Sequence, residues 1–295
     1  MSYKSVNLED TISIENLFTI HYFEYMSDFS FAGESHDFWE FVFVDKGEID
    51  IYMDNIHTRL KKREVAFHKP NEFHRLQATG SSAPNLVVIS FSCNSPAMSF
   101  FREKILTVDD FGKTLLGNII KEAKKLFDCR LDDPYLTEMI KKEEKPLGAE
   151  QLIKIQLEHF LLHLLRCSQN RNASALPKPA ASKGSSEIFN RVLEYMENHL
   201  DSRLTIDLLC KENMVGRSQL QKIFQQKTGL GVIEYFSHMK IDAAKQMMRT
   251  DFMNFTQISE SLGYSSIHYF SRQFKKITGM TPSEYVSSVK ALAEN

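Results

Sequence analysis

The sequence predicts a two-domain α+β protein, with a β-rich N-terminal domain, two helices after it and an all-α C-terminal domain. Short strand-like stretches bounded by turn residues fill the first third of the chain, and apolar segments with helical spacing follow them. The last third contains one stretch twice, at a constant offset. A segment rich in Pro, Ala and Ser separates the two parts. We therefore predict domains at 1–170 and 187–295, joined by a flexible linker at 171–186.

Composition places the chain among ordinary globular proteins, with 42% hydrophobic and 25% charged residues in 295. Its longest apolar runs, such as FVFV and LVVI, are far too short to span a bilayer, and the N-terminus lacks the apolar core of a signal peptide. The four cysteines lie far apart without a CxxC pair, which favours reduced thiols over a disulfide or zinc framework. We expect a cytoplasmic protein without membrane contact.

The N-terminal domain is expected to be a β-sandwich or small barrel, because its strand patterns are short and regularly spaced. Two helices should follow at 109–127 and 149–167, with an irregular charged segment at 130–147 between them. The expected strands cover 17–24, 36–45, 48–53, 56–60, 64–67, 73–78 and 85–92.

The stretch 255–285 has the pattern of a helix-turn-helix, two helices joined by a tight turn. Gly263 can end the first helix in a left-handed conformation, and Ser265 is a suitable N-cap for the second. Thr281 and Glu284 then predict a capping box around a further helix. With its apolar stripe inward, the second helix should expose side chains that can contact bases or phosphates, namely His268, Ser271, Arg272 and Lys275.

A second copy of this pattern occupies 204–235, exactly fifty residues upstream. We interpret the two copies as a duplicated helix-turn-helix, because five identities at one offset within the same apolar frame are hard to obtain by chance. The corresponding exposed residues of the first copy are Arg217, Ser218, Gln221 and Lys222. The identical pairs are Phe224 and Phe274, Thr228 and Thr278, Gly229 and Gly279, Glu234 and Glu284, and Tyr235 and Tyr285.

Charge is distributed in a way that suits a nucleic-acid partner, although the net charge of the chain is −2. Residues 211–276 carry ten basic and five acidic side chains, so the positive excess lies on the duplicated unit. A single charge in this region, such as Lys240, is expected to lie on a solvated helix face.

The C-terminal motif GYSSIHYFSRQFKKITGMTPSEY resembles the signature of AraC-type transcription regulators. This resemblance covers roughly residues 204–285 and implies a DNA-binding domain in which one long helix joins two helix-turn-helix units. Because proteins of that family often dimerise through the segment before the linker, we favour a subunit interface over domain core for helix 149–167. The candidate interface residues are Leu152, Ile155, Leu161, Leu164 and Leu165.

The N-terminal domain is similar to a cupin barrel, in the pattern His36-x3-Glu40-x6-Gly47 followed by Pro70-x3-His74. His36 and Glu40 lie four residues apart on the expected strand 36–45, so they should face the same side, together with Phe38 and Val42. Metal-binding cupins have a further histidine where this chain has Glu34. We therefore favour a small-molecule site over a purely structural barrel or a metal site, and expect no cofactor. The candidate ligand-binding residues are His21, His36, Phe38, Glu40, Val42 and His74.

Three functions remain open at this point. The favoured one is a transcription regulator, activator or repressor, that binds double-stranded DNA as a homodimer, responds to a small-molecule effector and, as an activator, contacts RNA polymerase. The second is a metal-dependent cupin enzyme fused to a DNA-targeting module, and the third is a constitutive DNA-binding dimer with a structural barrel. Motifs such as Walker A, GxSxG and HExxH are absent from the sequence, so we predict no catalytic residues and no enzyme.

Overall fold

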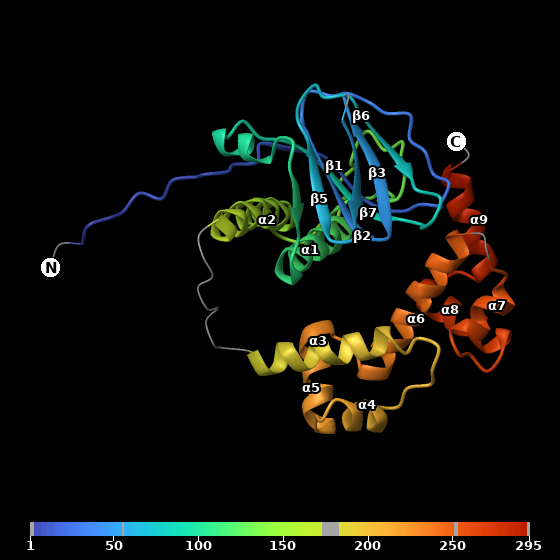
Figure 1. Cartoon of the computed structure of the whole chain (residues 1–295). Coiled ribbons are helices and arrows are strands. Elements are labelled where there is room, and N and C mark those ends of the chain that lie inside the picture. The colour runs from blue at the N-terminus through green and yellow to red at the C-terminus, as the bar shows by residue number, and fades with distance from the viewer. Residues whose placement is uncertain (1–2, 55, 173–182, 251–252, 294–295) are drawn as a thin grey trace. The chain divides into compact units, whose positions relative to one another are not determined.

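A computed structural model describes residues 3–54, 56–172, 183–250 and 253–293, and Figure 1 shows its elements. The chain forms two compact units that divide near residue 175. The N-terminal unit contains two β-sheets and two long helices, and the C-terminal unit is helical. Within the described residues, no helix is both long enough and apolar enough to cross a membrane.

The N-terminal unit is built on two antiparallel sheets (Figure 1). The larger sheet has the strand order β1-β7-β2-β5-β8 and the smaller has the order β4-β3-β6. The strands are β1 (Asn16–Glu24), β2 (Trp39–Lys46), β3 (Glu48–Met53), β4 (Ile56–Lys61), β5 (Glu64–His68), β6 (His74–Ala78), β7 (Asn85–Ser92) and β8 (Ile105–Thr107).

Strand β2 has a buried residue at each of its first six positions, because both of its faces are covered. Alternate side chains of a strand point to opposite faces. Val42 and Val44 enter the core between the two sheets, whereas Phe41 and Phe43 enter a second core against the helices. The N-terminal unit therefore has three layers, the small sheet, the large sheet and the helices. Loss of one such phenylalanine side chain typically costs about 3–5 kcal/mol.

Two long helices cover the large sheet, α1 (Asp110–Leu126) and α2 (Ala149–Asn172), after a short 3₁₀ helix at Pro96–Phe101. The side chain of Asp109 caps α1 by accepting a hydrogen bond from the Gly112 amide. Phe160 of α2 lies 5.4 Å from Phe41 between ring centroids, which ties α2 to the centre of β2.

The interface prediction for α2 is wrong for two of its five residues. Leu161 and Leu164 are buried, at 0% and 3% exposure, in the core that α2 shares with α1 and the sheet. Leu165 is partly buried against the same core. Leu152 and Ile155 are exposed, at 45% and 49%. Sequence spacing alone did not distinguish the face toward α1 from the face toward solvent.

The linker prediction, 171–186, differs from the structure at both ends. Helix α2 continues through Asn172, and helix α3 (Lys183–Glu197) begins within the range expected to be linker. The remaining positions, 173–182, lie outside the described residues.

The C-terminal unit contains two helix-turn-helix pairs joined by helix α6 (Val232–Arg249). The first pair packs with α3 around Leu209, Leu220 and Phe224, and the second buries Ile258, Phe270 and Phe274. The helices of the first pair are α4 (Ile206–Glu212) and α5 (Arg217–Thr228); those of the second are α7 (Phe255–Ser261) and α8 (Ile267–Thr278), followed by α9 (Pro282–Ala293).

The ends of the two recognition-type helices, α5 and α8, use the same contacts. Gly229 and Gly279 cap them with φ of +74° and +81°, a left-handed conformation that favours glycine. Thr228 Oγ1 donates to the Phe224 carbonyl at 2.8 Å, and Thr278 Oγ1 donates to the Phe274 carbonyl at the same distance. The capping box predicted at Thr281 and Glu284 is present, whereas the N-cap of α8 is Ser266 instead of the predicted Ser265.

Lys240 was expected on a solvated helix face, and this expectation is wrong. Its side chain is buried, and its ammonium group donates to the carbonyl oxygens of Ser202 and Leu262, both at 2.8 Å. Burial lowers the pKa of Lys240, and the nearby Asp201 opposes that shift. Lys240 therefore links α6 to the loop before α4 and to the end of α7.

Candidate nucleic-acid interface and ligand cavity

Helix α5 exposes all four of the residues predicted to contact nucleic acid in the first copy. Their neighbours Leu220, Ile223 and Phe224 are buried, so the helix presents one polar face to solvent. Arg217 lies 3.3 Å from Asp207 of α4, and both side chains are exposed. Such an exposed pair is worth little, so Arg217 can exchange Asp207 for another anion at small cost. The exposed residues are Arg217, Ser218, Gln221 and Lys222.

Helix α8 presents the equivalent face of the second copy. His268, Arg272 and Lys275 are exposed, and Ser271 is half-buried. The Arg272 guanidinium lies 5.5 Å from the ring centroid of Tyr269, which restricts its side chain without neutralising its charge. The two copies thus offer similar faces, each with a basic side chain at the equivalent positions 222 and 272.

The N-terminal unit contains a cavity of about 340 Å³ at one end of the space between the sheets. This volume lies within the range of small-molecule pockets. Its walls are largely aromatic, and its polar groups are carboxylates, imidazoles and hydroxyls. The aromatic lining comes from Phe18, Phe23, Tyr25, Phe31 and Phe38.

Five of the six predicted ligand residues line this cavity, and Val42 does not. Val42 is fully buried between the sheets. His36 and Phe38 precede β2, which begins at Trp39, so the shared strand face expected for His36 and Glu40 is wrong. His36 and Glu40 nevertheless both line the cavity. The His36 ring is held in place because it stacks on Phe38 and its Nδ1 lies 3.1 Å from the Phe38 carbonyl oxygen. The five that line it are His21, His36, Phe38, Glu40 and His74.

Four side chains of the cavity converge so closely that one donor atom from each lies within 4.8 Å of the others: Glu34, His36, Glu40 and His74. His74 Nε2 lies 3.3 Å from one Glu40 oxygen and 3.9 Å from Glu34. His36 Nε2 lies 3.8 Å from the other Glu40 oxygen. We call these four residues the acceptor cluster, because carboxylates and unprotonated imidazole nitrogens all accept hydrogen bonds.

The backbone sets which imidazole nitrogens face the cluster. His36 Nδ1 and His74 Nδ1 each lie 3.1 Å from a carbonyl oxygen, of Phe38 and Glu72 respectively, so each Nδ1 carries a proton. Each Nε2 is then directed at the carboxylates. Both Nε2 atoms are buried and lack a hydrogen bond of good geometry within the described residues. This arrangement calls for a positive charge among the four side chains, supplied by a proton or by a bound cation.

The side chains of the acceptor cluster stabilise one another's charged forms. Burial favours a raised pKa for Glu40, but His36 and His74 outweigh it and the pKa is lowered, so Glu40 is anionic. Burial opposes the charged form of His74 too, yet Glu40 raises its pKa above the ordinary value. The Ser90 hydroxyl donates to Glu40 at 2.7 Å.

His68 supports this site from behind His74, and sequence reasoning missed it. The strand expected at 64–67 stops one residue short of it, but His68 ends β5, is fully buried and stacks on His74 with 4.1 Å between ring centroids. Its Nδ1 lies 3.6 Å from Glu72, which is also buried. Burial lowers the pKa of His68. The spacing of His68, Glu72 and His74 was the available signal, since i, i+4 and i+6 positions across a tight loop can meet.

Most of the C-terminal unit is similar to a known domain family. A helix-turn-helix domain family matches residues 209–288, which begin within α4, cover the rest of both pairs and end within α9. These residues form an AraC-type helix-turn-helix domain.

Curated relatives are similar to this chain over about half of its length or more. The MmsAB operon regulatory protein of Pseudomonas aeruginosa is 28% identical over 148 residues, 48% of each chain. An uncharacterised HTH-type transcriptional regulator of Staphylococcus aureus is 27% identical over 254 residues, 86% of this chain and 32% of its own. The chain thus spans about a third to a half of the length of these relatives. Among solved structures, ToxT from Vibrio cholerae aligns over 95% of this chain with 14% identity and a TM-score of 0.36, too low to establish a common arrangement of the whole chain.

Proposed function

We propose that this protein is a sequence-specific DNA-binding transcription regulator that acts in the cytoplasm. The observation that carries the proposal is the pair of exposed polar helix faces, α5 and α8, within an AraC-type domain. A helix of this kind lies in the major groove, where its side chains can contact base edges.

The proposed base contacts come from equivalent positions of the two copies. Lys222 and Arg272 suit guanine and Gln221 suits adenine. Arg217 and His268 lie nearer the helix starts, and Lys275 one turn beyond Ser271, where phosphates are within reach. Ser218 and Ser271 can donate to either kind of group. Helix α6, with 18 residues, is about 27 Å long, so it can hold the two copies on successive major grooves about 34 Å apart if the DNA bends slightly.

Selection of bound sequences from a random DNA pool tests this proposal. We expect enrichment of a site with two short conserved blocks separated by about one helical turn. A control protein with Lys222→Ala and Arg272→Ala should enrich no shared sequence. Recovery of the input pool by the unaltered protein would contradict sequence-specific binding.

We further propose that the cavity binds a small effector that controls DNA binding. The acceptor cluster and its aromatic walls favour a molecule with a cationic or strongly donating group. Such a molecule can regulate only if it binds the DNA-competent and incompetent states with different affinity. Repeating the DNA selection with candidate metabolites, and screening them by thermal shift, tests this part.

A metal ion is a second candidate occupant, favoured by the two buried Nε2 atoms that lack hydrogen bonds. His36, Glu40 and His74 would hold it with Glu34, and each imidazole already donates Nδ1–H to a carbonyl, as metal-bound histidines do. A bound ion would supply a fixed positive charge among the carboxylates. We propose a binding role for the cavity and no catalysis. Stoichiometric metal in protein purified without chelator, lost in His36→Ala, would favour the metal over an organic effector.

We also propose that the protein acts as a homodimer, and as an activator would contact RNA polymerase. The exposed apolar residues Leu152 and Ile155 lie on the face of α2 opposite its core-facing residues. This face replaces the set predicted from the sequence, because two of those residues are core. Two-fold pairing of α2 would bury both side chains.

A further inference from the structure

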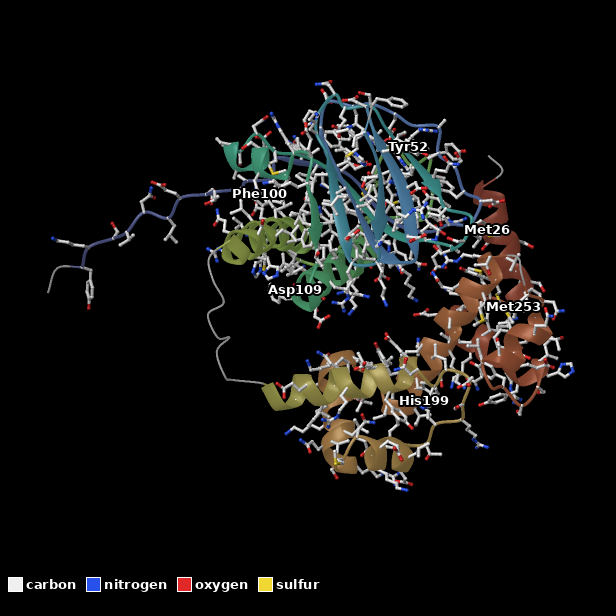
Figure 2. All side chains as sticks on the ribbon, viewed as in Figure 1. Met26, Tyr52, Phe100, Asp109, His199 and Met253 are labelled. Atoms are coloured by element: carbon white, nitrogen blue, oxygen red, sulfur yellow. The ribbon has the colours of Figure 1, made fainter. Side chains whose placement is uncertain are left out.

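A second group of potential metal ligands lies outside the cavity, where the start of α1 meets the C-terminal half of α2. It consists of Asp109, His163 and Cys167, whose donor atoms all lie within 4.8 Å of one another. Figure 2 labels Asp109 at the beginning of α1. The group offers oxygen, nitrogen and sulfur, whereas the acceptor cluster offers no sulfur.

The distances bring His163 to the centre of the group. Its Nε2 lies 2.9 Å from Asp109 Oδ1 and 3.5 Å from Cys167 Sγ. Cys167 Sγ also lies 3.9 Å from Nδ1, so Nε2 is the ring nitrogen nearest to both partners. A relay would use opposite nitrogens of the ring, as in an acid–base triad. Because Asp109 and Cys167 both lie nearest to Nε2, a single cation bound at Nε2 could contact all three side chains.

Local structure fixes the three side chains before any ligand binds. His163 and Cys167 are four residues apart in α2, so they lie on the same helix face. Asp109 is held by its capping bond to Gly112. Phe111 packs edge-on against His163, with 4.9 Å between centroids. Ligands that are already oriented lose little conformational entropy on binding.

We propose that Asp109, His163 and Cys167 bind a zinc ion that joins the C-terminal turns of α2 to the start of α1. Zinc accepts this mixture of ligands at about 2.0–2.3 Å, which places the ligand atoms of a tetrahedral site roughly 3.3–3.6 Å from one another. Cys167 Sγ and His163 Nε2 already lie at such a separation, 3.5 Å, whereas Asp109 Oδ1, at 2.9 Å from Nε2, must move away from it slightly. Magnesium and calcium prefer oxygen ligands alone, and the thiolate excludes them.

Binding has a defined proton balance. The Cys167 thiol releases its proton to solvent. The proton that His163 Nε2 donates to Asp109 leaves Nε2, and through exchange with solvent the neutral imidazole carries its single proton on Nδ1, so Nε2 is free to coordinate and one proton is released in total. The hydrogen bond between His163 and Asp109 is replaced by two bonds to zinc. A water molecule completes a tetrahedral shell.

Cobalt titration of the full-length, reduced protein tests the site directly. A cobalt–thiolate bond gives a charge-transfer absorption that oxygen and nitrogen ligands do not give, so the signal separates this site from the acceptor cluster. We expect one equivalent of cobalt to produce this absorption and one equivalent of zinc to remove it.

Three variants sharpen the test. Cys167→Ser should abolish the charge-transfer absorption. Asp109→Asn, which keeps the helix cap, should weaken zinc binding by more than the roughly 10–100-fold typical of losing an outer-shell partner. Cys210→Ser changes another half-buried thiol, in the C-terminal unit, and should leave the absorption intact. Circular dichroism confirms that each variant is folded.

Two results would overturn the proposal. The first is a cobalt titration of the unaltered protein without charge-transfer absorption. The second is an absorption that survives in Cys167→Ser, or that disappears in Cys210→Ser. If Cys167→Ser does not fold, the same absorption is measured in two other single variants, Asp109→Asn and Cys167→Ala. An absorption that survives in Cys167→Ala would then overturn the proposal.

Discussion

Gly263 packs directly against the backbone of Asp201, so closely that a Cβ on the glycine would overlap the Asp201 carbonyl oxygen. The glycine follows α7, and Asp201 precedes α4, so this contact joins the second helix-turn-helix to the loop before the first. Lys240 donates to the next residue along, Ser202, and to Leu262. The two copies therefore meet at a small junction made mostly of backbone.

Gly263→Ala should destabilise the C-terminal unit by more than Gly279→Ala. Both glycines have positive φ, so both substitutions carry left-handed strain of about 1–2 kcal/mol. Only Gly263 has backbone within reach of the new methyl group, whereas the space around Gly279 is open. Urea unfolding followed by far-UV circular dichroism measures the difference. The fluorescence of Trp39, the single tryptophan, reports the N-terminal unit and should be unchanged. Equal losses in the two variants would show that the junction tolerates a side chain.

Lys240→Met should weaken the junction by about 1–3 kcal/mol, because two carbonyl oxygens lose their donor. The methionine keeps most of the buried side-chain volume. Lys222→Met, at an exposed position, should change the free energy of unfolding by less than about 0.5 kcal/mol. The same denaturation experiment measures both. If Lys240→Met were as stable as the unaltered protein, the ammonium group would have no role in stabilising the junction.

Arg272→Ala should reduce affinity for the selected DNA site by about 1–3 kcal/mol and relax the preference at one base pair. Lys275→Ala, on the same helix face, should instead weaken binding to all sequences and reduce its salt dependence. Fluorescence anisotropy with the selected site and with point variants of it separates the two patterns. A uniform loss for Arg272→Ala would assign that side chain to the phosphates.

Leu152→Glu together with Ile155→Glu should yield folded monomers, since both side chains are exposed and the charges would oppose pairing of α2. Leu161→Glu should instead unfold the N-terminal unit, because it buries an unpaired carboxylate in the core. Light scattering gives the mass, and Trp39 fluorescence reports the fold. A dimer that persists in the first variant would place the interface on another surface.

Glu40→Gln should remove the response to the effector while leaving basal DNA affinity within about twofold, since Glu40 lies in the other unit from α5 and α8. The amide keeps the shape of the side chain but removes the buried carboxylate of the acceptor cluster, leaving only that of Glu34. Glu48→Gln, on the half-exposed start of β3, is the control and should respond normally. An unchanged response in Glu40→Gln would exclude the acceptor cluster as the effector site.

The repeat in the C-terminal sequence could be recognised because its identical residues occupy positions where backbone geometry restricts the choice. Gly229 and Gly279 adopt positive φ, and Thr228 and Thr278 make the same turn hydrogen bonds. Phe224 and Phe274 fill the two cores. Such positions carry the same residue in both copies, so the fold of this unit was evident from the sequence.

Other features depended on contacts between distant segments and were not predictable from local patterns. The environment of Lys240 is formed by residues 38 and 22 positions away. The division of α2 into a core face and an exposed face depends on where α1 lies. His68 packs against His74, a residue of the cavity wall, because β5 and β6 bring the two rings together, and periodicity within one segment contains no such information.

The packing on both faces of β2 fixes the register of this strand. Glu40 and Val42 point to one side of it and Phe41 to the other, where Phe41 meets Phe160 of α2. A slip of the strand by one residue would exchange these two sets of side chains and is therefore forbidden by the packing on both faces. An occupant of the cavity that shifts the backbone of Glu40 would therefore also shift Phe41 on the opposite face, and through it the contact with Phe160 of α2.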